Sequence, residues 1–164
     1  MQPEIDQLST DTGETIGYVR YDPATTTATM SAVASNNGNP LTYGLGADVT
    51  IPLYAGAAGK AILAHCPPEV VQNQALQPLT LRSPTTEEQL QQDLQKIRET
   101  GRAQAEGERI PDAQGIAAPF FADDTIAGSL TFTIPRFRAD IVDLSALTTM
   151  LTDTARQVTA LLSV

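Results

Sequence analysis

The sequence predicts an α+β domain with a mainly antiparallel sheet, flanking helices and a long C-terminal helix. Segments with the two-residue alternation of β-strands come in pairs joined by turn-forming residues, which is typical of antiparallel hairpins. Helical segments lie between and after these pairs, whereas parallel α/β proteins alternate single strands with helices. No repeat, low-complexity tract or linker divides the 164 residues, and this length is typical of one domain.

The N-terminal half is expected to hold one helix followed by strands. Ile5 and Leu8 lie at helical spacing, and Gly13 is suited to the C-cap of this helix. Residues with strand-like alternation follow, with turn-forming residues between them. The elements predicted in this half are a helix over 3–12, a hairpin over 15–21 and 25–34, and short strands over 41–45 and 49–53.

The second half is expected to begin with helices and to end with a strand pair and a long helix. Thr85 and Glu88 have the spacing of a capping box, which places a helix start there. Asp140 is a suitable N-cap for the last helix. The elements predicted in this half are helices over 55–64, 68–75 and 85–101, strands over 114–121 and 125–134, and a final helix from 140 to the chain end.

The charge balance excludes several classes of partner. The chain carries 10 Lys and Arg against 19 Asp and Glu, a net charge of −9. A nucleic-acid-binding domain needs a basic face for the phosphates, so this balance argues against direct contact with DNA or RNA. It also opposes binding to anionic membranes. No apolar run approaches the ~18 residues of a membrane span, and no signal peptide is recognised, so we expect a cytoplasmic protein without a membrane partner.

Few residues are available for catalysis or metal binding. His65 is the only histidine and Cys66 the only cysteine, so any nucleophilic mechanism that needs a histidine must use His65. One His-Cys pair does not supply a metal site, which needs several ligands. We therefore expect no metal, no cofactor and no catalytic residue. A small hydrolase or lyase that uses Cys66 or His65 stays open as an alternative.

Two features indicate a ligand pocket. The helix start around Ala57 and Ala58 has almost no side chains, so a ligand carboxylate can approach its backbone N–H groups. Thr131 and Thr133 alternate with apolar residues and place two hydroxyls on one face of a strand. Each feature has a structural alternative, because close helix–sheet packing explains the small residues and a solvated sheet face explains the hydroxyls.

The sequence PLYAGAAGKAILA at 52–64 resembles the signature of the effector-binding domain of IclR-type transcriptional regulators. Three further segments resemble that family in the same order: TGET at 12–15, IRETG at 97–101 and the paired strands at 115–135. Together these motifs extend the resemblance over about residues 8–162. It implies a GAF-like fold, with a curved antiparallel sheet, flanking helices and a concave pocket for a small-molecule effector.

The resemblance also implies an assembly and a domain organisation. Members of the family are usually dimers or tetramers and bind DNA through an N-terminal winged helix-turn-helix domain. We expect residues 1–164 to form the effector-binding domain, with 1–13 as the end of the linker helix, and the DNA-binding domain to be absent from this chain. DNA would be contacted only through that absent domain, while the partners of this chain would be an effector and further copies in a homodimer or tetramer.

The pocket residues of the family map onto positions of this sequence by resemblance. The backbone at Ala57 and Ala58 would hold the carboxylate of an effector, and the hydroxyls of Thr131 and Thr133 would bind its polar groups. The remaining positions implied for effector binding are Ala105, Gly115, Leu41, Tyr43 and Ile51.

Two of these positions depart from the family. Ala105 stands where the family commonly has an acidic residue, and Gly115 stands where it commonly has a cysteine. The loss of a carboxylate and a thiol is expected to enlarge the pocket, so we expect a larger, partly apolar carboxylate such as an aromatic acid, rather than glyoxylate or pyruvate. An oligomerisation or interaction domain without a ligand remains an alternative, because side chains can fill the pocket.

Overall fold

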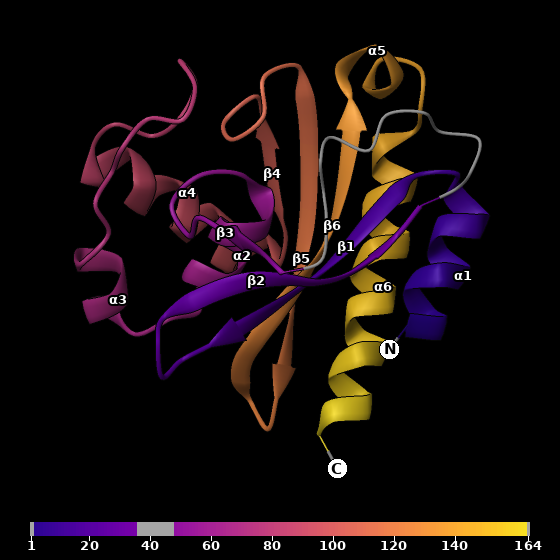
Figure 1. The fold of residues 1–164 in the computed structure, drawn as a ribbon, viewed down its shortest axis with the longest axis horizontal. Helices are drawn as coiled ribbons and strands as arrows, with labels where there is room; N and C mark the ends of the chain where they lie inside the picture. Colours follow the sequence, from indigo (N-terminus) through magenta and orange to yellow (C-terminus); the bar gives the residue numbers. More distant parts are fainter. Residues whose placement is uncertain (1, 36–47, 164) are drawn as a thin grey trace.

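The computed structural model describes residues 2–35 and 48–163 and contains a six-stranded antiparallel sheet with helices on both faces (Figure 1). The predicted α+β class with a long C-terminal helix is confirmed. The strand order is β3-β2-β1-β6-β5-β4, and every neighbouring pair is antiparallel. In chain order the elements are α1 (Gln2–Thr12), β1 (Thr15–Asp22), β2 (Thr27–Ala34), β3 (Val49–Ile51), α2 (Ala57–Leu63), α3 (Pro68–Gln72), α4 (Glu87–Thr100), β4 (Ala103–Glu106), β5 (Ala113–Ala122), β6 (Thr125–Pro135), α5 (Arg136–Ala139) and α6 (Leu144–Leu162).

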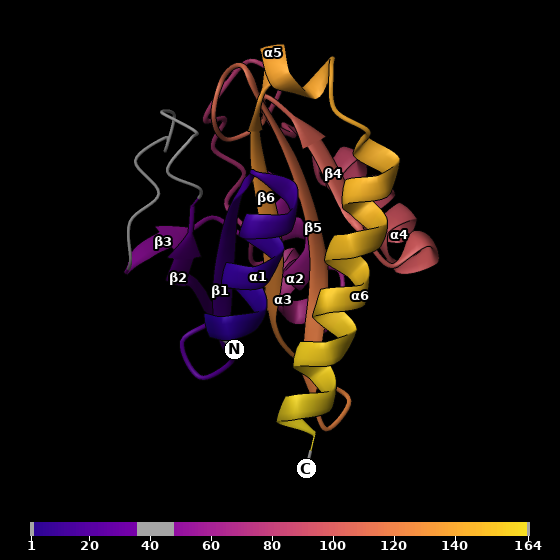
Figure 2. The ribbon, with the colours of Figure 1, turned by 90° about the vertical axis from the view of Figure 1, so that its right-hand side faces the viewer.

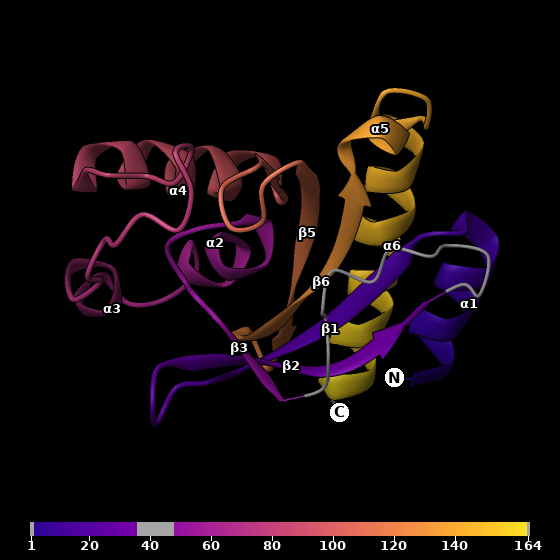
Figure 3. The same ribbon diagram turned by 45° about the horizontal axis from the view of Figure 1, so that its top comes forward.

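The helices form two groups on opposite faces of the sheet (Figure 2). α1 and α6 lie side by side on one face, whereas α2, α3 and α4 lie on the other (Figure 3). Each face has its own buried apolar cluster. The sheet therefore separates two layers of helix, and the site described below lies in the α2–α4 layer.

Strand β6 contributes to both faces because successive side chains of a strand alternate. Leu130, Phe132 and Ile134 belong to the apolar cluster under α1 and α6. The polar side of the strand faces the other layer, where Ser129 and Thr131 are 0% and 3% exposed. A solvated sheet face therefore does not explain the hydroxyls of this strand.

Two predicted helix caps are wrong by one to three residues. α4 begins after Thr86, whose side chain accepts a hydrogen bond from the Gln89 N–H over 3.1 Å, so the predicted cap Thr85 is one residue early. α6 begins after Asp143, whose carboxylate caps it, instead of at Asp140. In each case a nearby residue of the same type caps the helix, because the sequence signals the start of a helix only to within a few residues.

Two short elements are absent from the predictions. α5 lies between the predicted strand over 125–134 and the predicted last helix, and β4 follows α4 directly. Each has four residues, which is too short for a periodic pattern to be visible. β4 pairs with β5 at the edge of the sheet and forms one side of the site. The strand predicted over 41–45 lies outside the described residues.

Candidate functional site

A cavity lies between the start of α2 and the strands β4, β5 and β6. Its volume is about 30 Å³, which is enough for roughly one water molecule. Six of the predicted pocket residues line it together, from four separate segments of the chain: Ala57, Ala58, Ala105, Gly115, Thr131 and Thr133. The β4–β5 loop contributes Gly107, Glu108, Arg109 and Ile110 to the same lining.

Glycines allow α2 to sit directly on the sheet and on the segment before it. A Cβ at Gly59 would lie 1.8 Å from the Pro52 carbonyl oxygen, so a larger residue does not fit there. A Cβ at Gly115 would lie 3.1 Å from the Cβ of Ala57. The start of α2 therefore occupies the space directly beside this glycine.

Two of the three hydroxyls of β6 that face α2 have a hydrogen-bond partner among the described residues, and the third has none. Ser129 Oγ donates to the Ala58 carbonyl over 2.9 Å and so holds the helix on the strand. Thr131 Oγ1 donates to the Ile116 carbonyl of the neighbouring strand over 3.2 Å. Thr133 lines the cavity, and none of the described residues forms a hydrogen bond with its hydroxyl. Of the two predicted hydroxyls, that of Thr133 is the more available to a ligand.

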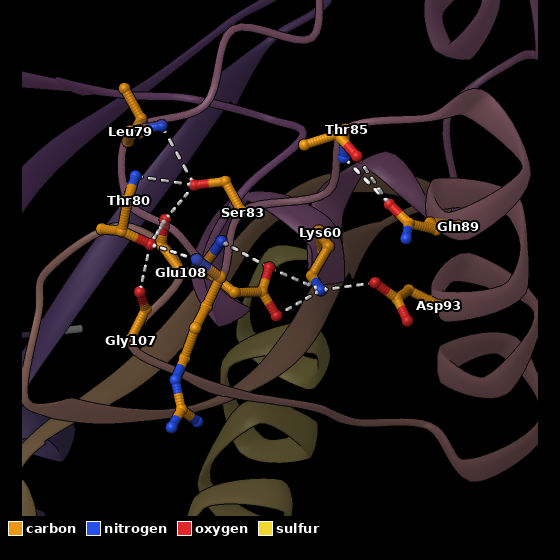
Figure 4. Close-up of polar contacts among 11 residues, drawn as sticks. Lys60, Leu79, Thr80, Ser83, Thr85, Gln89, Asp93, Gly107 and Glu108 are labelled. Atoms are coloured by element: carbon orange, nitrogen blue, oxygen red, sulfur yellow. Dashed lines mark hydrogen bonds and ion pairs between the residues drawn. The ribbon is translucent and has the colours of Figure 1, made fainter.

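Lys60 lies inside α2 and connects it to two other segments (Figure 4). Its side chain is 3% exposed, and its ammonium lies 2.8 Å from the Glu108 carboxylate and 2.9 Å from that of Asp93. Glu108 also accepts a hydrogen bond from the Gly56 N–H over 3.3 Å. A buried ammonium is stable only with such partners, so this network fixes α2, α4 and the β4–β5 loop relative to one another.

The β4–β5 loop is also held from its other side, by the segment before α4. The hydroxyls of Thr80 and Ser83 donate to the carbonyl oxygens of Gly107 and Glu108 (Figure 4). Gly107 has φ +65°, a left-handed conformation that favours glycine. These contacts fix the backbone of Glu108 and of the next residue, Arg109, at the cavity.

Arg109 brings positive charge to the cavity and is missing from the predicted site residues. Its side chain is partly buried and lies against Gly56, where a Cβ would be 3.6 Å from the arginine Nε. No described residue forms an ion pair or hydrogen bond with its guanidinium. Burial lowers its pKa, but an arginine remains charged at neutral pH. The sequence has no signal for this role, because a Glu-Arg pair in a loop is typical of a solvated surface.

The other three predicted pocket residues are not among the described lining of this cavity. Ile51 is 2% exposed and belongs to the apolar cluster between the sheet and α2. It does not line this cavity, and its role in effector binding stays a prediction. Leu41 and Tyr43 lie outside the described residues.

His65 and Cys66 follow α2 at the end remote from the cavity, and neither lines it. The Cys66 thiol lies 3.4 Å from the Ile62 carbonyl, and burial raises its pKa, which disfavours the thiolate that a nucleophile needs. Burial and the nearby Arg98 lower the pKa of His65, whose ring packs edge-on against Phe121 at 5.1 Å between centroids. Both residues have the environment of packing residues.

Within 2–35 and 48–163, no three His, Cys, Asp or Glu side chains come together to hold a metal ion. No helix of these segments is long and apolar enough to cross a membrane. The cavity itself offers a guanidinium, a hydroxyl and backbone amides, which are groups that bind anions.

Comparison with known proteins identifies the family. The family model described as bacterial transcriptional regulator IclR C-terminal matches residues 1–160. The chain belongs to this family. The family and the fold are those of transcriptional-regulator domains rather than enzymes, so the alternative of a hydrolase that uses Cys66 or His65 is wrong. A comparison with curated proteins gives no match.

Solved structures of regulators share this IclR C-terminal fold. An IclR regulator from a Silicibacter species has 21% identity and a TM-score of 0.91, over 98% of this chain and 64% of that one. The C-terminal domain of E. coli KdgR has 22% identity and a TM-score of 0.81, over 99% and 96%. The inducer-binding domain of Acinetobacter PobR, a double mutant in complex with 3-hydroxybenzoic acid, has 21% identity and a TM-score of 0.82, over 96% and 94%. The chain thus spans less than two thirds of the Silicibacter protein.

Proposed function

We propose that this chain is the ligand-sensing domain of an IclR-type regulator and binds a small organic carboxylate in the cavity beside α2. One observation carries the proposal: Arg109 and Thr133 line the same cavity, and neither side chain has a partner among the described residues. The first turn of α2, at Ala57 and Ala58, lines it as well and has no side-chain cap. A guanidinium, a hydroxyl and amide N–H groups all donate hydrogen bonds, which suits a carboxylate.

The proposed effector is an aromatic or similarly apolar acid. Ala105 and Gly115 add no polar side chain to the cavity, and Ile110 and Ala113 add apolar surface to it. The PobR inducer-binding domain was solved with 3-hydroxybenzoic acid, which supports an aromatic acid for this chain. Glyoxylate has no apolar part to match this lining, and pyruvate has only a methyl group.

Binding of such an acid would change the shape of the domain. A cavity of about 30 Å³ is far smaller than an aromatic acid, so the segments that line it would have to move apart. The ligand would therefore favour an open arrangement over the closed one, which is the difference in affinity that a regulatory switch requires. In a cytoplasmic homodimer or tetramer, we propose that this bias alters DNA binding by winged-helix domains joined to the α1 end.

A second candidate is an oligomerisation domain that binds no ligand. The small volume of the cavity favours it, because α2 and its neighbours fill most of the space against the sheet. Thr131 and Thr133 would then serve packing alone, and Arg109 would be a partly buried surface residue. This candidate predicts that no small acid binds the domain.

A thermal-shift panel of benzoate, 3-hydroxybenzoate, pyruvate and glyoxylate distinguishes these functions. A ligand that binds only the folded state raises the melting temperature with concentration. We expect the two aromatic acids to raise it and the two keto acids to leave it unchanged. Stabilisation by the keto acids alone would contradict the proposed ligand class, and stabilisation by none of the four would favour the oligomerisation domain.

A further inference from the structure

We infer that Arg109 is the residue that selects an anionic effector, and that Lys60 keeps Arg109 available by holding the neighbouring Glu108. The inference rests on the proposed function, since it names the group that recognises the charge of the ligand at that same site. Lys60 is a positioning residue in this scheme, because it acts on the ligand only through Glu108 and Arg109.

Glu108 and Arg109 are adjacent in the chain, and both side chains lie against Gly56. The Glu108 carboxylate accepts a hydrogen bond from the Gly56 N–H over 3.3 Å. A Cβ placed on Gly56 would lie 3.2 Å from the Cβ of Arg109 and 3.6 Å from the Nε of Arg109. A carboxylate and a guanidinium on adjacent residues that contact the same glycine attract each other when neither has another partner.

The structure shows that the Glu108 carboxylate is instead committed to Lys60. The ammonium lies 2.8 Å from this carboxylate, and the two side chains are 3% and 13% exposed. Asp93, which is 44% exposed, provides the second carboxylate at 2.9 Å. Lys60 therefore neutralises Glu108 and removes it as a competitor for the guanidinium.

Glu106, at the end of β4, is committed to other partners too. Glu106 lies 3.6 Å from the guanidinium of Arg82 and 3.4 Å from that of Arg136. Segment 36–47 contains no Asp or Glu in the sequence. Arg109 is thus a partly buried cation at a cavity without a carboxylate partner among the described residues. A ligand carboxylate would supply the charge-assisted hydrogen bonds that such a guanidinium lacks.

The first experiment measures charge selectivity by isothermal titration of 3-hydroxybenzoate and of its neutral amide, 3-hydroxybenzamide. Arg109→Gln is expected to weaken binding of the acid at least about tenfold, and to leave binding of the amide within about threefold. Arg109→Lys keeps a positive charge and should lose less affinity for the acid than Arg109→Gln does. Equal binding of the acid by the wild type and Arg109→Gln would overturn the inference.

The second experiment tests Lys60 by rescue. Lys60→Met frees the Glu108 carboxylate to pair with Arg109, so we expect about tenfold weaker binding of 3-hydroxybenzoate. Lys60→Met, Glu108→Gln should recover to within about threefold of the wild type. If Lys60 were needed only for structure, the double variant would stay as weak as the single one. Circular dichroism melts show that each variant is folded at the temperature of titration.

The outcomes separate this inference from the proposed function. If the wild type binds 3-hydroxybenzoate and changes at Thr131 and Thr133 weaken it, while Arg109→Gln does not, the cavity is the site and Arg109 does not select the charge. If the wild type binds neither 3-hydroxybenzoate nor any other acid of the panel, both the proposed function and this inference are overturned.

Discussion

The α1–α6 face and the α2–α4 face of one sheet bury different kinds of residue. Under α1 and α6, strands β5 and β6 contribute large apolar side chains such as Phe120 and Phe132, both 0% exposed. Under α2, strand β6 presents Thr131 and Thr133 instead. A buried lysine, Lys60, pairs with two carboxylates on that side.

We propose that the two faces of the sheet have different roles: the α1–α6 face stabilises the fold, and the α2–α4 face binds the ligand. Burial of a large apolar side chain contributes roughly 1.5–3 kcal/mol to folding, so the α1–α6 face can hold the sheet together by apolar packing. Polar groups buried on the other face lose hydration and stabilise the fold only when they are paired. Because strand side chains alternate, substitutions in the same strand can test the two faces independently.

The largest effect is expected on the apolar face. Phe132→Ala removes a fully buried ring and should lower the free energy of unfolding by about 3–5 kcal/mol, measured by urea denaturation. Phe137→Ala is the matched control, because Phe137 is 65% exposed and should change stability by less than about 0.5 kcal/mol. A loss below about 1 kcal/mol for Phe132→Ala would contradict a stabilising role for this face.

A somewhat smaller effect is expected from the buried charges of the opposite face. Lys60→Met should lower the free energy of unfolding by about 3 kcal/mol, because the Glu108 carboxylate, 13% exposed, loses its ammonium. Lys60→Met, Glu108→Gln should recover most of this loss, since no buried charge is left without a partner. Equal stability of the single and the double variant in urea would show that the pair is not energetically coupled.

The hydroxyls of β6 are expected to matter for binding far more than for folding. Thr131→Val, Thr133→Val should change the free energy of unfolding by less than about 1 kcal/mol and weaken binding of 3-hydroxybenzoate about tenfold. Thr154→Val on α6 is the matched control, since its hydroxyl bonds within the helix to the Met150 carbonyl. Unchanged affinity in the folded double variant would remove both hydroxyls from the site.

The smallest effect is pH-dependent and comes from His65. Burial and Arg98 lower its pKa in the folded state, so the unfolded chain takes up the proton at a higher pH. Stability is therefore complete above the unfolded pKa and is lost as the pH falls from that value toward the folded one. His65→Gln should show a shallower fall of unfolding free energy between about pH 7.5 and pH 5. The same pH dependence of the unfolding free energy in the wild type and in His65→Gln would contradict this contribution of His65.

Much of the fold is predictable because its signals are local. Gly13 is predicted as a helix C-cap and has φ +73°, and Gly101, which caps the predicted helix over 85–101, has φ +77°. Leu147, Leu151 and Val158 have helical spacing in the sequence and are buried along α6. Elements of four residues such as β4 and α5 show no such pattern, and only their place beside longer elements defines them.

The site is predictable only in part, because only some of its signals are local. Alternation along β6 places Thr133 on the polar face, and the small residues at Ala57 and Ala58 mark a close approach to the sheet. Arg109 could not be predicted, because its availability depends on the contact between Lys60 and Glu108, 48 residues apart in the chain. Such a contact arises only when α2 docks beside the β4–β5 loop.

The location of the site can be measured directly by NMR on the domain with labelled threonine methyl groups. During titration with 3-hydroxybenzoate, we expect the methyl signals of Thr131 and Thr133 to shift with ligand concentration. The signal of Thr154, on the opposite face, should stay in place. Shifts at Thr154 with constant Thr131 and Thr133 signals, or no shifts at any concentration, would contradict an effector site beside α2.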